Sequence, residues 1–115
     1  MKVISFVNMK GGVGKSTLAV NFASCLAKRN SQKTLIIDMD PQFNATQCLI
    51  NTQKYVDHKK NNKDTILNVF HTNPLVDVSI ISGSTPAKVK PLNEIEPTFV
   101  AENLYLLPGI YLYIV

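Results

Sequence analysis

The feature that most constrains this chain is a glycine-rich segment, residues 9–17 (MKGGVGKST), which we call the glycine loop. Residues 3–7 (VISFV) before it are mostly β-branched or apolar and predict a short buried strand that ends at the glycines. After Lys15, apolar residues recur at roughly helical spacing as far as Ala27. A strand, a glycine loop and a helix in this order predict an α/β fold with a mainly parallel, doubly wound sheet.

The glycine loop has the composition needed to wrap a polyphosphate. Backbone N–H groups bind phosphate best where no side chain prevents close approach, and the following helix adds the positive end of its dipole. In the pattern G-x-x-x-x-G-K-[ST] the lysine reaches the β and γ phosphates and the hydroxyl holds magnesium. Lys15 and Ser16 are therefore expected to bind ATP and Mg²⁺, although Met9 stands where that pattern has glycine. The alternative, a flexible surface turn that matches by chance, is disfavoured by the flanking strand and helix.

A second apolar run, Thr34–Asp38, predicts another buried strand, which completes a right-handed βαβ unit with the first. Asp38 and Asp40 stand at its carboxyl end, the edge at which ligands collect in doubly wound sheets. Carboxylates there can serve magnesium or orient water for phosphoryl transfer. The alternative is an ordinary solvated strand end.

The remainder of the chain predicts short elements separated by polar segments. Prolines at four places argue against a long helix between residues 72 and 98. The elements expected are a short helix over 44–50, an exposed loop over 53–64, a short helix from a Thr65 cap through Phe70, extended chain over 78–81, and a third strand over 103–107.

The composition is that of one domain in a reducing compartment. The chain has 115 residues, 45% of them hydrophobic, and no linker or repeat divides it. No apolar run approaches the ~20 residues needed to cross a bilayer, and no signal peptide is recognisable, so a cytoplasmic location is expected. Cys25 and Cys48 lie in no metal-binding spacing and are interpreted as reduced structural thiols.

The positive charge is concentrated in the N-terminal half. Of the net charge of +4, residues 1–50 supply six Lys/Arg against two acids, and two of those lysines, Lys10 and Lys15, lie in the glycine loop. The pI is therefore weak support for nucleic-acid binding. Four lysines between residues 54 and 63 are either a solvated run or contacts to DNA phosphates, and both alternatives stay open. His58 and His71 lie in no ligand pattern, and no role is predicted for them.

Residues 10–17 (KGGVGKST) resemble the deviant Walker-A ATPases of the ParA/MinD family, which carry a second lysine just before the glycine pair. The resemblance implies ATP and Mg²⁺ as cofactors and an ATP-sandwich homodimer. It implies that Lys10 reaches the nucleotide phosphates of the partner subunit and that Thr17 helps to hold the α phosphate. The nucleotide-binding residues it implies are Lys10, Gly11, Gly12, Val13, Gly14, Lys15, Ser16 and Thr17.

Residues 38–42 (DMDPQ), with 44–46 (NAT), resemble ParA-type partition ATPases more than MinD or the nitrogenase iron protein. In that branch Asp40 would orient or activate the attacking water, and Asp38 would support magnesium and water. Phe43 replaces the small residue usual at its position. The resemblance implies a role in plasmid or chromosome partitioning, in which an ATP-dependent dimer holds nonspecific DNA and a centromere-binding partition protein stimulates hydrolysis.

The close resemblance covers residues 2–50, and a looser one continues through 65–70 and 103–109. Family members are longer, and their Walker-B strand and adenine-contacting residues follow this region. Residues 1–115 are therefore interpreted as the N-terminal part of one P-loop ATPase domain, with negligible turnover of ATP on their own. Two alternatives remain: a MinD-like membrane-associated ATPase, for which no amphipathic helix is visible, and a truncated nucleotide-binding fragment that does not hydrolyse ATP.

Overall fold

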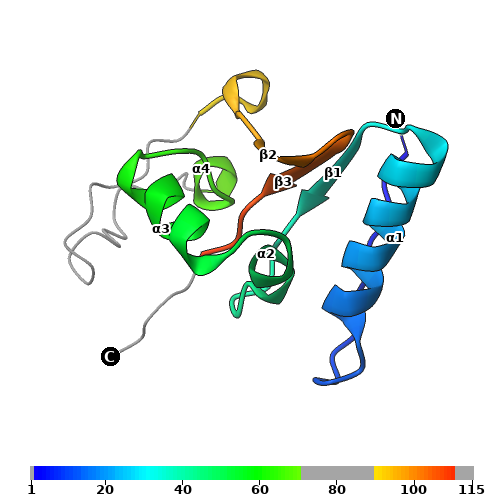
Figure 1. Cartoon of the computed structure of the whole chain (residues 1–115). Coiled ribbons are helices and arrows are strands. Elements are labelled where there is room, and N and C mark those ends of the chain that lie inside the picture. The colour runs from blue at the N-terminus through cyan, green and yellow to red at the C-terminus, as the bar shows by residue number, and fades with distance from the viewer. Residues whose placement is uncertain (1, 71–89, 111–115) are drawn as a thin grey trace.

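A computed structural model describes residues 2–70 and 90–110 of the chain (Figure 1). Its elements in chain order are α1 (Lys15–Asn30), β1 (Thr34–Ile37), α2 (Asn44–Leu49), α3 (Thr52–Lys60), α4 (Leu67–Phe70), a 3-10 turn η1 (Leu92–Glu94), β2 (Thr98–Ala101) and β3 (Leu104–Leu107). Within the described ranges, no helix is both long enough and apolar enough to cross a membrane.

The sheet is mixed and has the strand order β1-β3-β2. β1 pairs with β3 in parallel, from Thr34 opposite Leu104 to Ile37 opposite Leu107. β2 pairs with β3 antiparallel through a tight turn in which Asn103 is left-handed, with φ 59°. The parallel pair agrees with the sequence-based expectation, whereas the antiparallel β2 is an addition to it.

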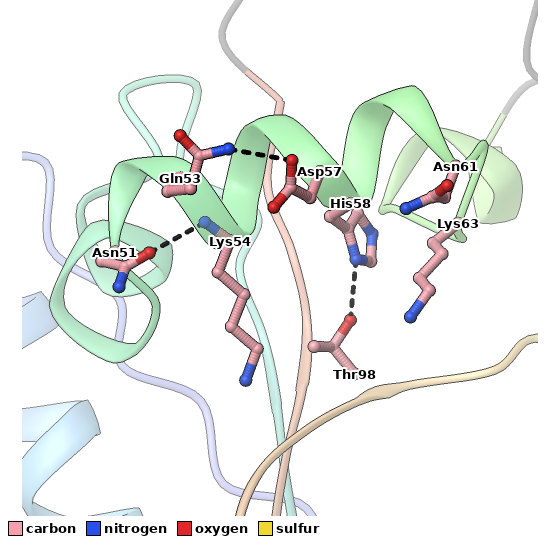
Figure 2. A pocket seen from close by; sticks show the side chains of 8 residues that line it. All are labelled: Asn51, Gln53, Lys54, Asp57, His58, Asn61, Lys63 and Thr98. Carbon is pink, nitrogen blue, oxygen red and sulfur yellow. Dashed lines mark hydrogen bonds between the residues drawn. The ribbon is translucent and has the colours of Figure 1, made fainter.

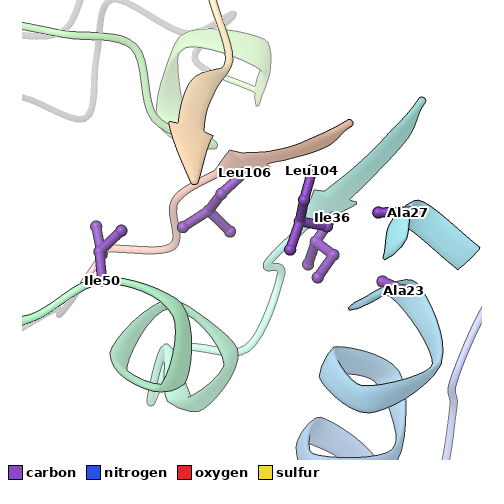
Figure 3. Packing of buried hydrophobic residues seen from close by; sticks show 6 residues of the cluster. All are labelled: Ala23, Ala27, Ile36, Ile50, Leu104 and Leu106. Atoms are coloured by element: carbon purple, nitrogen blue, oxygen red, sulfur yellow. The ribbon is translucent and has the colours of Figure 1, made fainter. Parts of the chain in front are cut away.

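The core lies between the sheet and α1. Ala23 and Ala27 are the buried residues of α1, and their small side chains let the helix approach the sheet closely. On the facing side of the sheet, Ile36 and Leu106 are buried, and Leu106 is fully so (Figure 3). Burying one such leucine stabilises the fold by about 1.5–3 kcal/mol.

The opposite face of the sheet is partly exposed, although Leu107, which pairs with Ile37 on this face, is buried. Side chains alternate between faces along a strand, so Leu35 and Ile37 point away from the core that holds Ile36. They are 46% and 51% exposed, and Phe99 of β2 is 58% exposed. The Phe99 ring packs edge-on against Tyr105, with ring centres 6.1 Å apart. The packed helices therefore cover one face of the described sheet.

Five predicted elements are confirmed within about three residues. They are α1, β1, α2, α4 and β3. α1 ends where expected from its sequence, because Lys28 and Arg29 complement the negative end of the helix dipole and Ser31 follows in a left-handed C-cap with φ 50°.

The prediction of a buried strand over residues 3–7 is wrong, and so is the βαβ unit built on it. The described segment 2–8 has no regular structure, and Val3 and Val7 are 77% and 87% exposed. A strand needs a neighbour for its backbone N–H and C=O groups. In the described sheet the parallel partner of β1 is β3, and residues 3–7 are not one of its strands. Phe6 instead lies against α1, where its ring meets Phe22 edge-on with centres 6.0 Å apart.

The prediction of an exposed loop over 53–64 is also wrong, because most of that segment forms α3. The helix begins at an Asn51 cap whose side chain accepts the Lys54 N–H at 2.8 Å, and half-buried Tyr55 packs against the core. At the start of α4, Thr65 is expected to accept a hydrogen bond from the helix, but side-chain hydrogen bonds run the other way. The Asn68 side chain accepts from the Thr65 N–H at 2.9 Å and from its hydroxyl at 3.2 Å. The extended chain expected over 78–81 lies outside the described residues.

Candidate nucleotide-binding site

The glycine loop forms the N-terminal entry to α1. Gly12 and Gly14 are left-handed, with φ 70° and 80°, a conformation that glycine adopts without steric cost. Gly14 is the N-cap residue of α1, no side chain caps the helix, and its first turn carries no acidic residue. The first helical hydrogen bond runs from the Leu18 N–H to the Gly14 carbonyl at 2.8 Å. The N–H groups at the start of α1 are therefore available to an anion.

The space over this loop suits a phosphate group. A Cβ atom built on Gly11, Gly12 or Gly14 would meet no other atom within 4 Å. At Gly12 and Gly14 the left-handed backbone already favours glycine, but at Gly11 neither φ nor packing does. Close approach of a ligand to the backbone is the remaining physical reason for glycine at that position. The loop as folded thus fits a polyphosphate.

The two lysines of the loop are held close to each other. The Lys15 Nζ donates to the Lys10 carbonyl at 2.9 Å, which keeps this ammonium group over the loop. The Lys10 N–H donates to the Asn8 side chain at 2.9 Å, while the Lys10 side chain is exposed. Met9 and Val13 are exposed as well, at 103% and 45%. A cationic and partly apolar rim therefore surrounds the open loop.

The donor set for magnesium is sparse. Ser16 is half-buried and Thr17 is exposed, both on the first turn of α1. Across the described ranges, no group of three or more His, Cys, Asp and Glu residues could hold a metal ion. Mg²⁺ commonly keeps several waters and binds through one or two protein groups plus substrate phosphates. The Ser16 hydroxyl beside a bound polyphosphate fits that manner of binding.

Asp38 lies buried at the end of β1, with 4% exposure. Its Oδ2 accepts the Thr46 N–H at 2.8 Å and the Thr46 hydroxyl at 2.7 Å, and its Oδ1 accepts the Asp40 N–H at 3.2 Å. Three donors compensate the buried carboxylate, so it anchors α2 to the end of β1. Direct contact with a metal would have to use the lone pairs that these donors leave.

Asp40 is half-buried and its carboxylate is held less tightly. Oδ1 accepts the Gln42 N–H at 2.9 Å, and Oδ2 lies 3.4 Å from the Asn44 side-chain nitrogen. These contacts form an Asx-type turn that leads into α2. The carboxylate keeps acceptor capacity for a water molecule.

The predicted site residues fall into two groups. Lys10 to Thr17 form one continuous loop, and Asp38 and Asp40 form a second group at the end of β1. In Figure 1 the chain passes from β1 into α2, and α2 packs against α1. No hydrogen bond or ion pair between described residues joins the two groups. Their roles toward nucleotide and metal stay predictions.

A polar pocket between α3 and β2 has no counterpart in the sequence-based predictions (Figure 2). It has a volume of about 320 Å³ and is lined by Asn51, Gln53, Lys54, Asp57, His58, Asn61, Lys63 and Thr98. His58 is buried at its base, with Nε2 2.8 Å from the Asp64 carbonyl oxygen and Nδ1 3.1 Å from the Thr98 hydroxyl. Thr98 lies 40 residues away in sequence, so no local signal pointed to this arrangement.

The surroundings of His58 favour its neutral form. Burial lowers the pKa of His58 below 6.5, and the charges of Lys63 and Lys59 lower it further, whereas the hydrogen bond that the ring makes to the Asp64 carbonyl oxygen raises it. Asp64 is itself buried and accepts from the Lys90 Nζ at 3.0 Å and the Glu96 N–H at 2.9 Å. That carboxylate raises the pKa of Lys90. Hydrogen bonds of His58 and of Asp64 therefore join α3 and the segment after it to residues 90–98.

The fold and the glycine loop are those of the P-loop class of proteins. A family model described as an AAA domain matches residues 1–111. A ParA family protein of the virulence plasmid of Chlamydia psittaci, pGP5-D, is 36% identical over 88 residues, which are 73% of this chain and 34% of that protein. The chain belongs to the ParA/MinD family of P-loop ATPases.

Two further similarities agree with this assignment. The chromosome-partitioning ATPase Soj of Thermus thermophilus is 52% identical over 46 residues, which are 40% of this chain and 18% of that protein. The crystal structure of protein DIP2308 from Corynebacterium diphtheriae superposes with a TM-score of 0.67 at 29% identity, over 95% of this chain and 36% of that one. The family and the α/β P-loop fold predicted from the sequence are thus confirmed. The chain spans about a third of the length of the plasmid relative and of the crystallised protein.

Proposed function

We propose that this chain binds ATP with Mg²⁺ through the glycine loop. The observation that carries the proposal is the uncapped start of α1, with left-handed Gly14 as its N-cap and the Lys15 ammonium held over the loop. In this proposal the N–H groups of the loop bind the phosphate oxygens and Lys15 binds the β and γ phosphates. Ser16 holds the metal, and Thr17 assists at the α phosphate. Bound magnesium neutralises phosphate charge.

Hydrolysis in this proposal depends on the second group of residues. Asp40 orients the attacking water, because its half-buried carboxylate retains acceptor capacity. Asp38 supports Asp40 and the magnesium environment from its buried position, through its hydrogen bond to the Asp40 N–H. Phosphoryl transfer to water needs positioning and charge neutralisation more than covalent catalysis.

We propose that the biological role is plasmid or chromosome partitioning. Relatives include proteins named as a chromosome-partitioning ATPase and as a ParA family protein, which supports this role. The finer steps are ATP-dependent formation of a homodimer, binding of nonspecific DNA, and stimulation by a centromere-binding partition protein. The exposed Lys10 side chain at the rim of the loop is the group proposed to reach the partner subunit's nucleotide.

The ATP proposal is tested with Lys15→Ala. Loss of a charge that contacts phosphate should weaken Mg-ATP binding by at least about tenfold in calorimetric titration. Lys28→Ala is the matched control, since Lys28 is an exposed lysine in the last turn of the same helix and should leave affinity unchanged. Equal affinity of the Lys15→Ala variant and the parent chain would contradict the proposal.

The partition proposal is tested with Lys10→Ala and two sedimentation assays. Lys10→Ala should impair ATP-induced association, measured by analytical ultracentrifugation, while nucleotide affinity of the monomer is kept. Cosedimentation with random DNA and with anionic liposomes, each with ATP, separates partitioning from a MinD-like membrane role. Binding to liposomes without binding to DNA would contradict the partition proposal.

A further inference from the structure

We propose that Thr46, Tyr55 and Gly109 are positioning residues that hold the loop of residues 38–43, and with it Asp40, in one conformation. The proposal rests on the proposed function, since it assigns these residues to the hydrolysis site. None of them lies in the glycine loop, and none was assigned a role from the sequence, although Thr46 ends the 44–46 (NAT) segment that carries the resemblance.

The loop contains a residue in an unfavourable backbone conformation. Phe43, the N-cap of α2, is left-handed with φ 40° and ψ 39°. A bulky residue without glycine's freedom adopts this conformation when surrounding contacts over-determine it. Contacts of the Phe43 side chain should therefore matter to the shape of the loop.

The Phe43 ring stacks on Tyr55 of α3. The ring centres are 5.2 Å apart and the planes are inclined by 17°. The Tyr55 hydroxyl in turn donates to the Gly109 carbonyl at 3.2 Å, just after β3. α3 is thereby joined both to the loop and to the segment that follows the central strand.

Gly109 closes the arrangement from the other side. Its N–H donates to the Thr46 hydroxyl oxygen at 3.0 Å, and that hydroxyl donates to Asp38 Oδ2 at 2.7 Å. A Cβ atom at Gly109 would lie 2.9 Å from the Phe43 Cβ and 3.3 Å from the Asp38 Cγ and carbonyl oxygen. Lack of space, and not a positive φ, therefore requires glycine here.

The contacts converge on Asp40. Asp38, fixed by Thr46, accepts the Asp40 N–H at 3.2 Å, and Phe43 ends the same loop three residues later. Thr46 has no exposed surface, so its hydroxyl cannot be replaced by water without rearrangement. A loop held at both ends in this way presents the Asp40 carboxylate in one place.

The test compares Thr46→Val, which keeps shape but removes the hydroxyl, with Thr46→Ser, which keeps the hydroxyl. Gln47→Ala is the matched control, because Gln47 is the exposed neighbour on α2. One readout is the NMR-detected exchange rate of the Asp40 and Gly109 amides, with α1 amides as an internal measure of intact folding. The second readout is ATP affinity with and without Mg²⁺.

In Thr46→Val we expect exchange at the Asp40 and Gly109 amides to rise by about tenfold or more, because the Gly109 N–H loses its buried acceptor. The gain in ATP affinity from Mg²⁺ should fall several-fold, by about threefold or more, while Mg-free affinity is kept. Thr46→Ser should restore both quantities, which a mere change in packing would not explain. Unchanged exchange and an unchanged Mg²⁺ gain in Thr46→Val would overturn the proposal.

Tyr55→Leu provides a second route to the same conclusion if Thr46→Val does not fold. It removes the stack and the hydroxyl from half-buried Tyr55, and it should speed exchange at Asp40 and Gln42 without changing exchange in α1. No change at these amides would overturn the proposal. If the parent chain binds no ATP with or without Mg²⁺, the proposed function fails, while the exchange rates still decide whether these residues position the loop.

Discussion

The buried carboxylate of Asp38 allows a sharp prediction about stability. Asp38→Ala removes the acceptor of two donors on fully buried Thr46, its N–H and its hydroxyl, and of the half-buried Asp40 N–H. Hydrogen bonds to charged groups contribute about 1.5–3 kcal/mol each, and a stranded buried donor costs about 1–3 kcal/mol. The Thr46 hydroxyl can rotate toward another acceptor, and removal of a buried charge offsets part of the loss. The expected destabilisation is about 3–4 kcal/mol.

That loss would be a large part of the total, because domains are stabilised by roughly 0.05–0.15 kcal/mol per residue. Asp38→Asn keeps one acceptor oxygen and should cost about 1–2 kcal/mol. The assay is urea unfolding followed by circular dichroism at pH 7. Asp57→Ala is the matched control, since Asp57 is an exposed acid on α3 whose loss should cost under about 0.5 kcal/mol. If Asp38→Ala lies within about 1 kcal/mol of the parent chain, the anchoring role assigned to Asp38 is refuted.

Three further perturbations test other parts of the structure. Burial lowers the pKa of His58 below 6.5, so the unfolded chain binds more protons than the folded chain as the pH falls. The free energy of unfolding should therefore be at its full value above pH 6.5 and should fall as the pH drops through the lowered pKa. In urea titrations at several pH values, His58→Gln should reduce this dependence of the free energy of unfolding on pH. Gly14→Ala should destabilise the fold by about 1–2 kcal/mol, because the φ of Gly14 is 80°. Gly11→Ala should have the stability of the parent chain but should bind ATP more weakly. A greater loss of stability in Gly11→Ala than in Gly14→Ala would contradict the loop geometry. Leu106→Ala should cost about 2–5 kcal/mol in thermal unfolding, with Leu35→Ala on the exposed face as control; equal losses would contradict the assigned core.

The elements that the sequence predicted well are those defined by local patterns. α1 has helical spacing of apolar residues, and basic residues at its end complement the dipole. β1 and β3 are short apolar runs bounded by polar or breaking residues. The glycine loop was recognisable because its geometry depends on contiguous residues, chiefly the left-handed Gly12 and Gly14.

The failures have long-range causes. Residues 3–7 have the composition of a strand, but pairing requires a partner that no local pattern reports. α3 was missed because its mean character is polar, although the Asn51 cap was a usable signal and Tyr55 provides its packing. The His58 environment depends on Asp64 and Thr98, which the tertiary fold brings together.

The same contrast separates the two halves of the candidate site. The phosphate-binding half is built by backbone conformations within residues 9–17, so it can form wherever α1 forms. The half that carries Asp40 depends on contacts that span 63 residues between Gly109 and Thr46 and 54 between Gly109 and Tyr55. Perturbation after β3 should therefore disorder Asp40 before it affects phosphate binding, and Gly109→Ala should lower the Mg²⁺-dependent gain in ATP affinity while the Mg-free affinity persists. An equal loss of both affinities would show that the two halves form a single unit.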